Sequence, residues 1–121
     1  MASSTSSSHP LFPRFTSKTP IATLIARNRA WANRQAHENP HLFPTLAEGQ
    51  HPQILWIGCS DSRIPETTVL DLLPGDVFVH RNMGNIVDAR DMSVLSAIEF
   101  AVETLAVKHI IICGIVFSLL H

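Results

Sequence analysis

The sequence predicts an α/β domain in which helices flank a parallel sheet of about three strands. Three short apolar runs, at residues 53–58, 77–79 and 109–113, are predicted strands, and the first is a continuous run of the kind buried on both faces of such a sheet. Segments with helical periodicity separate these runs, and alternating strands and helices indicate crossover connections. A length of 121 residues, of which 45% are apolar, suits one domain.

Residues 1–20 are rich in Ser, Thr and Pro and carry no periodic apolar face, so we expect a disordered tail before a domain over residues 21–121. Arg14 and Lys18, with no acidic residue nearby, would suit a mitochondrial transit peptide, but the prolines of this tail oppose the helix that such a peptide forms. We therefore expect a cytoplasmic protein, with mitochondrial import as the alternative. The two cysteines form no disulfide framework, which favours a reducing compartment.

The first predicted element is a helix over residues 21–38, where apolar residues recur at near-helical spacing between Ile21 and Trp31. Asn39-Pro40 ends this helix, because proline cannot continue the hydrogen-bond ladder. A short helical turn is predicted at residues 43–49, directly before the first strand.

Two further helices are predicted between the strands. Pro65 suits the first turn of a helix whose apolar face continues to Leu73, where Pro74-Gly75 ends it. Asp91 is a predicted N-cap, and the apolar residues after it repeat at helical spacing as far as Leu105.

The most informative motif is Cys59-Ser60-Asp61-Ser62-Arg63, which begins where the first apolar run ends. A thiol, a carboxylate and a guanidinium thus leave the sheet together, at the strand end where open α/β sheets place their sites. Taken alone, a buried structural cysteine and an ordinary ion pair would also explain these residues. Phosphatase loops also join a cysteine to an arginine around an anion, but with a longer spacing than the one here.

The motif and its flanking segments closely resemble the beta-class carbonic anhydrases. Glu48-Gly49-Gln50 precedes the motif, the segment Pro74 to Asn82 follows it, and the resemblance runs from about Ile21 to Gly114. It implies a zinc-dependent lyase that reversibly hydrates carbon dioxide to bicarbonate. It also implies a homo-oligomer, at least a dimer, whose first helix reaches across to a partner subunit.

The resemblance implies a role for each residue of the motif. Cys59 is the first zinc ligand, and Asp61 and Arg63 form a catalytic dyad in which the arginine holds the carboxylate away from the metal. Asp61 itself becomes a zinc ligand when that pair breaks. Gln50 and Phe78 correspond to positions that line the substrate pocket, the glutamine often being donated across the dimer interface. Zinc lowers the pKa of its bound water from about 15.7 to about 7, so that hydroxide can attack carbon dioxide.

The chain departs from the family directly after the third strand. There the family places its two remaining zinc ligands as His-x-x-Cys, whereas this chain has Ile115 and Ser118. Isoleucine has no donor atom, and a neutral hydroxyl is a poor zinc ligand. Cys59 and Asp61 alone form an incomplete ligand set, so we expect weak zinc binding and little or no activity from this chain by itself.

Two residues could replace the missing histidine. Cys113 lies about 6.6 Å back along the strand and would need a register shift, and His121 is the second candidate. The loss of the pattern after Gly114 predicts a C-terminally truncated or differently spliced product. The alternatives to an enzyme are a non-catalytic fragment that pairs with a full-length subunit and a mis-spliced product without function.

The overall charge and hydropathy restrict the expected partners. The formal net charge is −1, which provides no overall field for nucleic acid, and no run reaches the roughly 18 apolar residues of a membrane span. We therefore expect neither a nucleic-acid partner nor a membrane partner, with carbon dioxide and bicarbonate as the small-molecule partners implied by the resemblance.

Overall fold

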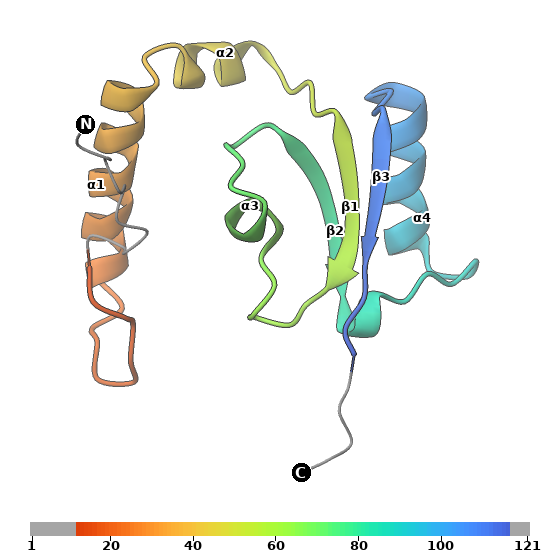
Figure 1. The fold of residues 1–121 in the computed structure, drawn as a ribbon, viewed down its shortest axis with the longest axis horizontal. Helices are drawn as coiled ribbons and strands as arrows, with labels where there is room; N and C mark the ends of the chain where they lie inside the picture. The colour runs from red at the N-terminus through yellow and green to blue at the C-terminus, as the bar shows by residue number, and fades with distance from the viewer. Residues whose placement is uncertain (1–11, 117–121) are drawn as a thin grey trace, which may run out of the picture. The chain divides into compact units, whose positions relative to one another are not determined.

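The computed structural model describes residues 12–116, and its contacts divide the chain into two units that meet between Ala47 and Glu48. The first unit holds helix α1, Thr23–Glu38, and the second holds the sheet (Figure 1). Helix α2, Leu42–Glu48, ends at the boundary. The order of elements along the chain agrees with the predicted alternation of strands and helices.

The two helices of the N-terminal segment lie where the sequence predicts them. Helix α1 begins two residues later than predicted, because Thr23 donates its hydroxyl to the carbonyl oxygen of Pro20 at 2.7 Å and Ile21 lies in the preceding turn. The rings of Trp31 in α1 and Phe43 in α2 meet edge to face, with their centroids 5.9 Å apart. This aromatic contact joins the two helices.

Residues 12–20 of the predicted tail contain neither a helix nor a strand. Arg27 of α1 nevertheless holds this segment. Its Nη2 donates to the carbonyl oxygen of Pro13 at 2.9 Å, and its guanidinium lies over the ring of Phe12, 5.2 Å from the centroid. The rest of the predicted tail, residues 1–11, lies outside the described residues.

The sheet of the second unit is parallel, as predicted, and its described strands are β1 (Ile54–Cys59), β2 (Val77–Asn82) and β3 (His109–Cys113) in the order β2-β1-β3. The central strand β1 is almost entirely buried, which explains its continuous apolar run. Strand β2 is three residues longer than the predicted 77–79. Its polar end carries no apolar signal, but it pairs with β1 as far as Cys59 opposite Asn82.

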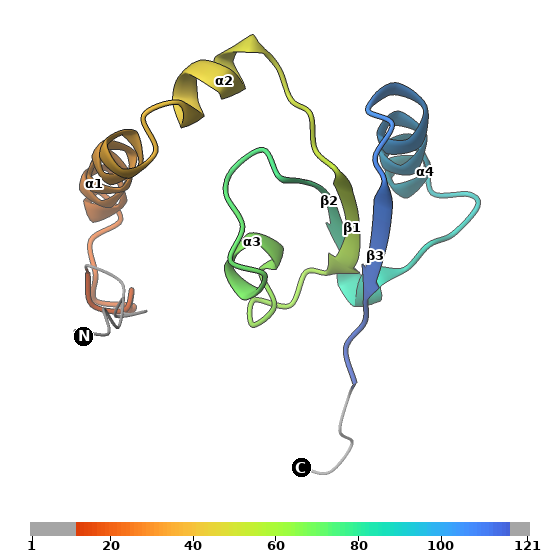
Figure 2. The ribbon, with the colours of Figure 1, turned by 45° about the horizontal axis from the view of Figure 1, so that its top comes forward.

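The two crossover connections place their helices on opposite sides of the sheet. The connection from β1 to β2 and the connection from β2 to β3 run in opposite directions across the sheet. Right-handed crossovers therefore put α3 (Glu66–Val69) on one face and α4 (Met92–Glu99) on the other. Figures 1 and 2 both show this arrangement.

Helix α3 is shorter than predicted, because it ends at Val69 and not at Leu73. Asp71 has a left-handed backbone with φ of 52°. The N–H of Leu72 donates to the carbonyl oxygen of Thr67, and the N–H of Asp71 to that of Thr68, which together form a Schellman motif. Glycine normally marks such an end, so an aspartate in this place gave no signal in the sequence.

Helix α4 begins at the predicted N-cap. The Asp91 carboxylate accepts the N–H of Ser93 at 2.9 Å. A π-helical turn, η2 (Phe100–Thr104), continues α4 toward β3. Together these elements cover one face of the sheet and form a small core. Its buried residues are Leu55, Ile57 and Ala101, and its partly buried ones are Phe78, Ile98 and Val107.

Candidate active site

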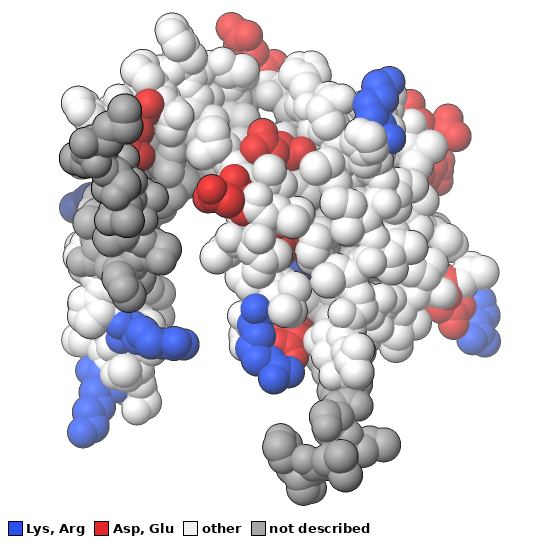
Figure 3. Space-filling view, viewed as in Figure 1, with Lys and Arg blue, Asp and Glu red and all other residues white. Residues whose placement is uncertain are grey.

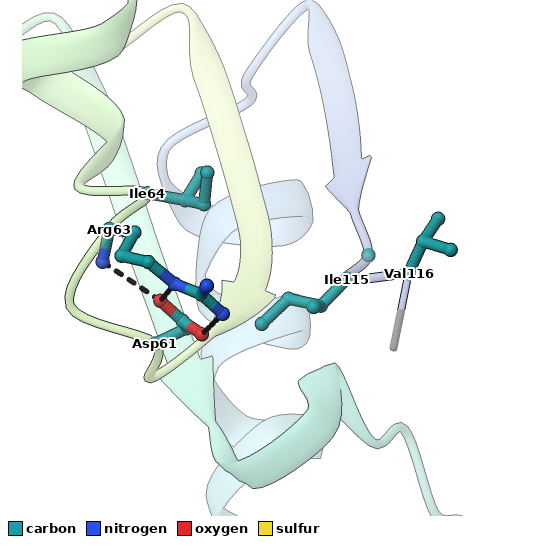
Figure 4. A pocket seen from close by; sticks show the side chains of 6 residues that line it. Asp61, Arg63, Ile64, Ile115 and Val116 are labelled. Carbon is teal, nitrogen blue, oxygen red and sulfur yellow. Dashed lines mark hydrogen bonds and ion pairs between the residues drawn. The ribbon is translucent and has the colours of Figure 1, made fainter. Parts of the chain in front are cut away.

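The candidate site lies at the carboxyl ends of β1 and β3. The chain leaves β1 toward β2, which lies on one side of β1, while β3 lies on the other side. The ends of β1 and β3 therefore flank the topological switch point of the sheet. A cavity of about 310 Å³ lies there. Its lining residues come from the loop after β1 and the segment after β3 (Figure 4): Asp61, Arg63, Ile64, Gly114, Ile115 and Val116.

Asp61 and Arg63 form a bidentate ion pair at the mouth of this cavity. The guanidinium donates Nε to Oδ1 at 3.0 Å and Nη2 to Oδ2 at 2.7 Å, and the backbone N–H of Arg63 also donates to Oδ1 at 2.8 Å (Figure 4). The Asp61 side chain is 17% exposed, whereas that of Arg63 is 76% exposed. The dyad implied by the resemblance is therefore present in its paired form.

This pairing keeps Asp61 ionised. The pKa of Asp61 lies at about 2, below its ordinary 3.8, mainly because of the side-chain hydrogen bonds from Arg63 and next because of the backbone N–H of Arg63. The positive charges of Arg63 and Arg81 lower this pKa further. Both carboxylate oxygens are committed to the guanidinium, so Asp61 is an anion that is not free to bind a metal in this arrangement.

Cys59 is buried and its thiol receives one backbone hydrogen bond. The N–H of Gly84 donates to Cys59 Sγ at 3.3 Å. Gly84 has a left-handed backbone with φ of 72°, a conformation that glycine adopts at no steric cost. Asn82 closes the loop that carries Gly84, because its side chain accepts the N–H of Ile86 at 2.7 Å and donates to the Ile86 carbonyl at 2.8 Å. The end of β2 thus fixes one donor to the sulfur.

The described residues do not fit a zinc ion. Within residues 12–116, no three His, Cys, Asp or Glu side chains form a group that could hold a metal. Cys59 ends β1 and Asp61 lies in the loop after it. From the segment after β3, the side chain of Ile115 points toward the Asp61–Arg63 pair (Figure 4). A hydrocarbon side chain therefore stands where the resemblance implies an imidazole.

Of the two proposed replacement ligands, the structure describes Cys113 alone. Cys113 pairs with Gly58 in the sheet register. Neighbouring residues of a strand point to opposite faces, so Cys113 and Cys59 lie on opposite faces of the sheet. Ser118 and His121 lie outside the described residues.

The two predicted pocket residues lie away from the dyad. Phe78 pairs with Leu55, which lies four residues before Cys59 in β1. At about 3.3 Å per residue, Leu55 and Cys59 are roughly 13 Å apart along the strand. The Phe78 ring packs in the core, 5.7 Å from the ring of Phe100. Gln50 is exposed in the segment before β1. Within one chain, the structure brings neither residue to the cavity.

Sequence reasoning missed a second pair with the geometry of the dyad. Arg90 binds Asp88 through its backbone N–H at 2.8 Å, Nε at 3.1 Å and Nη2 at 2.9 Å. The shared Asp-x-Arg pattern is the signal that could have found it. Sequence reasoning also missed the three residues that surround the motif from β2 and the loop after it, which are Arg81, Asn82 and Gly84. No spacing rule links these residues to Cys59.

The surface around the sheet carries both signs of charge. On the face shown in Figure 3, acidic and basic side chains of the sheet-containing unit are interspersed and form no extended basic surface. None of the helices in the described residues is long and apolar enough to cross a membrane.

The fold and the site together define a class of protein: an open parallel α/β sheet with a cysteine and an aspartate–arginine pair at its switch point. Comparisons with known proteins identify the family. The carbonic anhydrase family matches residues 54–115, about half of the chain. Carbonic anhydrases of Emericella nidulans and Candida albicans are 49% and 40% identical over 91 and 111 residues, which are 75% and 90% of this chain.

Solved structures agree with this match. The β-carbonic anhydrase CafA of Aspergillus fumigatus is 59% identical, with a TM-score of 0.76 over 77% of this chain and 45% of that one. A tetrameric β-carbonic anhydrase of Sordaria macrospora is also 59% identical, with a TM-score of 0.74 over 77% of this chain and 47% of that one. The chain therefore belongs to the carbonic anhydrase family, in its beta class. It spans about two-fifths of the length of the curated relatives that it matches, 40% and 39% for the two named above.

Proposed function

We propose that this chain carries one half of a carbonic anhydrase site, and that the reaction of that site is the zinc-dependent reversible hydration of carbon dioxide to bicarbonate. Cys59 is the zinc ligand of this half, and Asp61 and Arg63 are its catalytic pair. Gln50 and Phe78 belong to the substrate pocket only when chains assemble. By itself the chain binds zinc weakly and turns over little carbon dioxide.

The observation that carries this proposal is the contrast between the two strand ends. At the end of β1, the Cys59 thiol, the Gly84 N–H and the bidentate pair between Asp61 and Arg63 form an ordered arrangement. Ile115 faces that arrangement from the segment after β3 and offers no donor atom. This contrast supports a half-site, with polar groups at the end of β1 and an apolar side chain facing them.

The first experiment measures zinc content and carbon dioxide hydration of the purified 121-residue chain. We expect less than stoichiometric zinc and a hydration rate close to the uncatalysed one. Stoichiometric zinc with rapid turnover would contradict the proposed half-site.

The second experiment restores the donor atoms. The double variant Ile115→His/Ser118→Cys is expected to bind zinc more tightly than the original chain, because it presents two more ligands of the kinds that zinc prefers. The matched control adds Cys59→Ser to the double variant, and zinc binding should then fall again. If this triple variant keeps the gained affinity, Cys59 is not a ligand.

We also propose that α1 is an interface with a second subunit, either a copy of this chain or a full-length relative. Ile21 before α1 and Ile25 within it are 72% and 62% exposed, and Leu24 beside them is 42% exposed. Apolar side chains grouped in this way on a helix indicate a protein contact. The relative from Sordaria macrospora is described as tetrameric, which supports an oligomer here as well.

The test of this interface is the mass of the chain in solution. By light scattering, the wild-type chain should have a mass above that of a monomer, and the variant Leu24→Asp/Ile25→Asp should have the mass of a monomer. The matched control, Arg29→Ala, changes a charged residue of the same helix and should leave the mass unchanged. A monomeric wild-type chain that captures no full-length relative would contradict the proposal.

We propose a cytoplasmic location, with mitochondrial import as the alternative. Both cysteines of the described residues are free thiols, and they lie on opposite faces of the sheet, which suits a reducing compartment. The measurement is the location of residues 1–20 fused to a fluorescent protein. Mitochondrial fluorescence would establish the alternative.

A further inference from the structure

We propose that Arg81 is a positioning residue that sets the spacing between the Cys59 thiol and the Asp61 carboxylate. This inference rests on the proposed half-site. It adds to that site a residue of β2 that touches neither the proposed metal nor the dyad side chains.

The contacts of Arg81 are directed at the backbone of the motif. Its Nε donates to the carbonyl oxygen of Cys59 at 2.7 Å, and its Nη2 donates to the carbonyl oxygen of Asp61 at 2.5 Å. One planar guanidinium therefore bridges the two carbonyls on either side of Ser60. These carbonyls belong to Cys59 and Asp61, so the Arg81 guanidinium fixes the backbone of Cys59 relative to that of Asp61.

The loop after β1 depends on these hydrogen bonds, because it lies beyond the last residue pair of β1 and β2. Pairing between β1 and β2 ends with Cys59 opposite Asn82, and the N–H of Ser60 then donates to the Asn82 carbonyl at 2.8 Å. Asp61 comes after the last ladder contact. The Arg81 guanidinium supplies the tertiary contact that continues the attachment to β2 as far as Asp61.

Glu66 of α3 forms an ion pair with the third nitrogen of the Arg81 guanidinium. Arg81 Nη1 lies 3.6 Å from Glu66 Oε2, and both side chains are largely buried. Glu66 Oε2 is buried and makes no hydrogen bond, so this ion pair is its polar contact in the described structure. A buried carboxylate without its counter-charge would be costly, which ties the position of Arg81 to the start of α3.

The test is the rate at which iodoacetamide alkylates Cys59 in the metal-free chain, with Cys113→Ser present so that one thiol is counted. Cys59 is 7% exposed, so alkylation requires the loop to open. Arg81→Lys keeps the charge but loses the planar guanidinium that binds both carbonyls. We expect alkylation to become about tenfold faster, because one charged hydrogen bond is lost. The control Arg90→Lys changes the other dyad and should leave the rate unchanged.

Hydrogen exchange distinguishes positioning from a general loss of stability. In Arg81→Lys the amide of Ser60 should exchange about tenfold faster, while the amide of Ile57 in β1 should keep its wild-type rate. Equal acceleration at both amides, in proportion to the rise in the unfolding equilibrium constant measured with urea, would assign Arg81 a general structural role and overturn the proposal. Unchanged alkylation in a folded variant would overturn it as well.

A second variant keeps the proposal testable if Arg81→Lys does not fold. Glu66→Gln removes the counter-charge and leaves the Arg81 guanidinium in place, and alkylation should rise by about two- to fivefold. An unchanged rate in folded Glu66→Gln, together with unchanged Ser60 exchange, would overturn the inference. None of these measurements uses zinc or activity, so a failure of the proposed reaction and a failure of this inference give different results.

Discussion

Arg63 binds Asp61 through its own backbone N–H and two nitrogens of its guanidinium, and Arg90 binds Asp88 through the same three donors. One pair lies in the candidate site and the other lies in an exposed loop. The geometry of the dyad is therefore a local property of the Asp-x-Arg sequence, and the fold decides only where the pair points.

The first prediction concerns Arg63→Gln. Without the guanidinium, the pKa of Asp61 should rise from about 2 toward 3.8, and the rise should be partial because the backbone N–H of residue 63 and the charge of Arg81 still lower this pKa. Carboxyl NMR titration measures it. The matched control Arg90→Gln should raise the pKa of Asp88, which the Arg90 side chain holds below its ordinary value, and leave Asp61 unchanged.

The same pair predicts a pH dependence of stability. The folded pKa of Asp61 lies below its unfolded value, so the pair stabilises the fold above about pH 4, and this stabilisation is lost as the pH falls toward about 2. Across this window, the free energy of unfolding measured with urea should fall more for the wild-type chain than for Arg63→Gln. Identical pH profiles would show that Asp61 is not held by Arg63 in solution.

The second prediction concerns Gly58→Ala. A Cβ at this position would lie 2.2 Å from Nε1 of the buried Trp56 indole, so the strand or the indole must move. We expect the free energy of unfolding in urea to fall by about 1–3 kcal/mol. Gly114→Ala is the matched control, because its Cβ would make ordinary contacts of 3.8 Å and more. Equal losses in the two variants would contradict the close approach.

The third prediction concerns Ala106→Gly. Ala106 has a left-handed backbone with φ of 52° between η2 and β3, a conformation that costs an L-residue about 1–2 kcal/mol. Glycine relieves this strain but adds freedom to the unfolded chain, so the net gain should be about 0.5–1 kcal/mol in unfolding free energy. The contrasting variant Ala101→Gly, in the buried π-helical turn, should instead lose about 1 kcal/mol. A loss in both would refute the assigned strain.

The fourth prediction concerns Gly84→Ala. The left-handed φ of 72° at Gly84 should make this substitution cost about 1–2 kcal/mol of unfolding free energy, and it should displace the N–H that meets Cys59. Asn85 has φ of 45°, and asparagine tolerates this region, so Asn85→Gly should change stability by less than about 0.5 kcal/mol. Thermal and urea unfolding measure both, and a neutral Gly84→Ala would contradict the turn geometry.

Much of the fold follows from local patterns. The continuous apolar run of β1 predicted a strand buried on both faces, and Asp91 predicted the start of α4. The end of α3 could not be predicted, because Asp71 takes a left-handed conformation that its neighbours impose. The polar end of β2 was missed because pairing with β1, and not its own composition, makes it a strand.

For the site, the sequence by itself determined the motif, the pairing of Asp61 with Arg63 and the lack of a donor atom at Ile115, because each depends on residue type or on neighbours within two positions. The tertiary structure alone decided that Gly84 meets the Cys59 thiol and that Arg81 bridges the carbonyls of Cys59 and Asp61. It also decided that Cys113 faces away from Cys59. These contacts join strands that are distant in sequence, so they depend on sheet order and register, which no local spacing encodes.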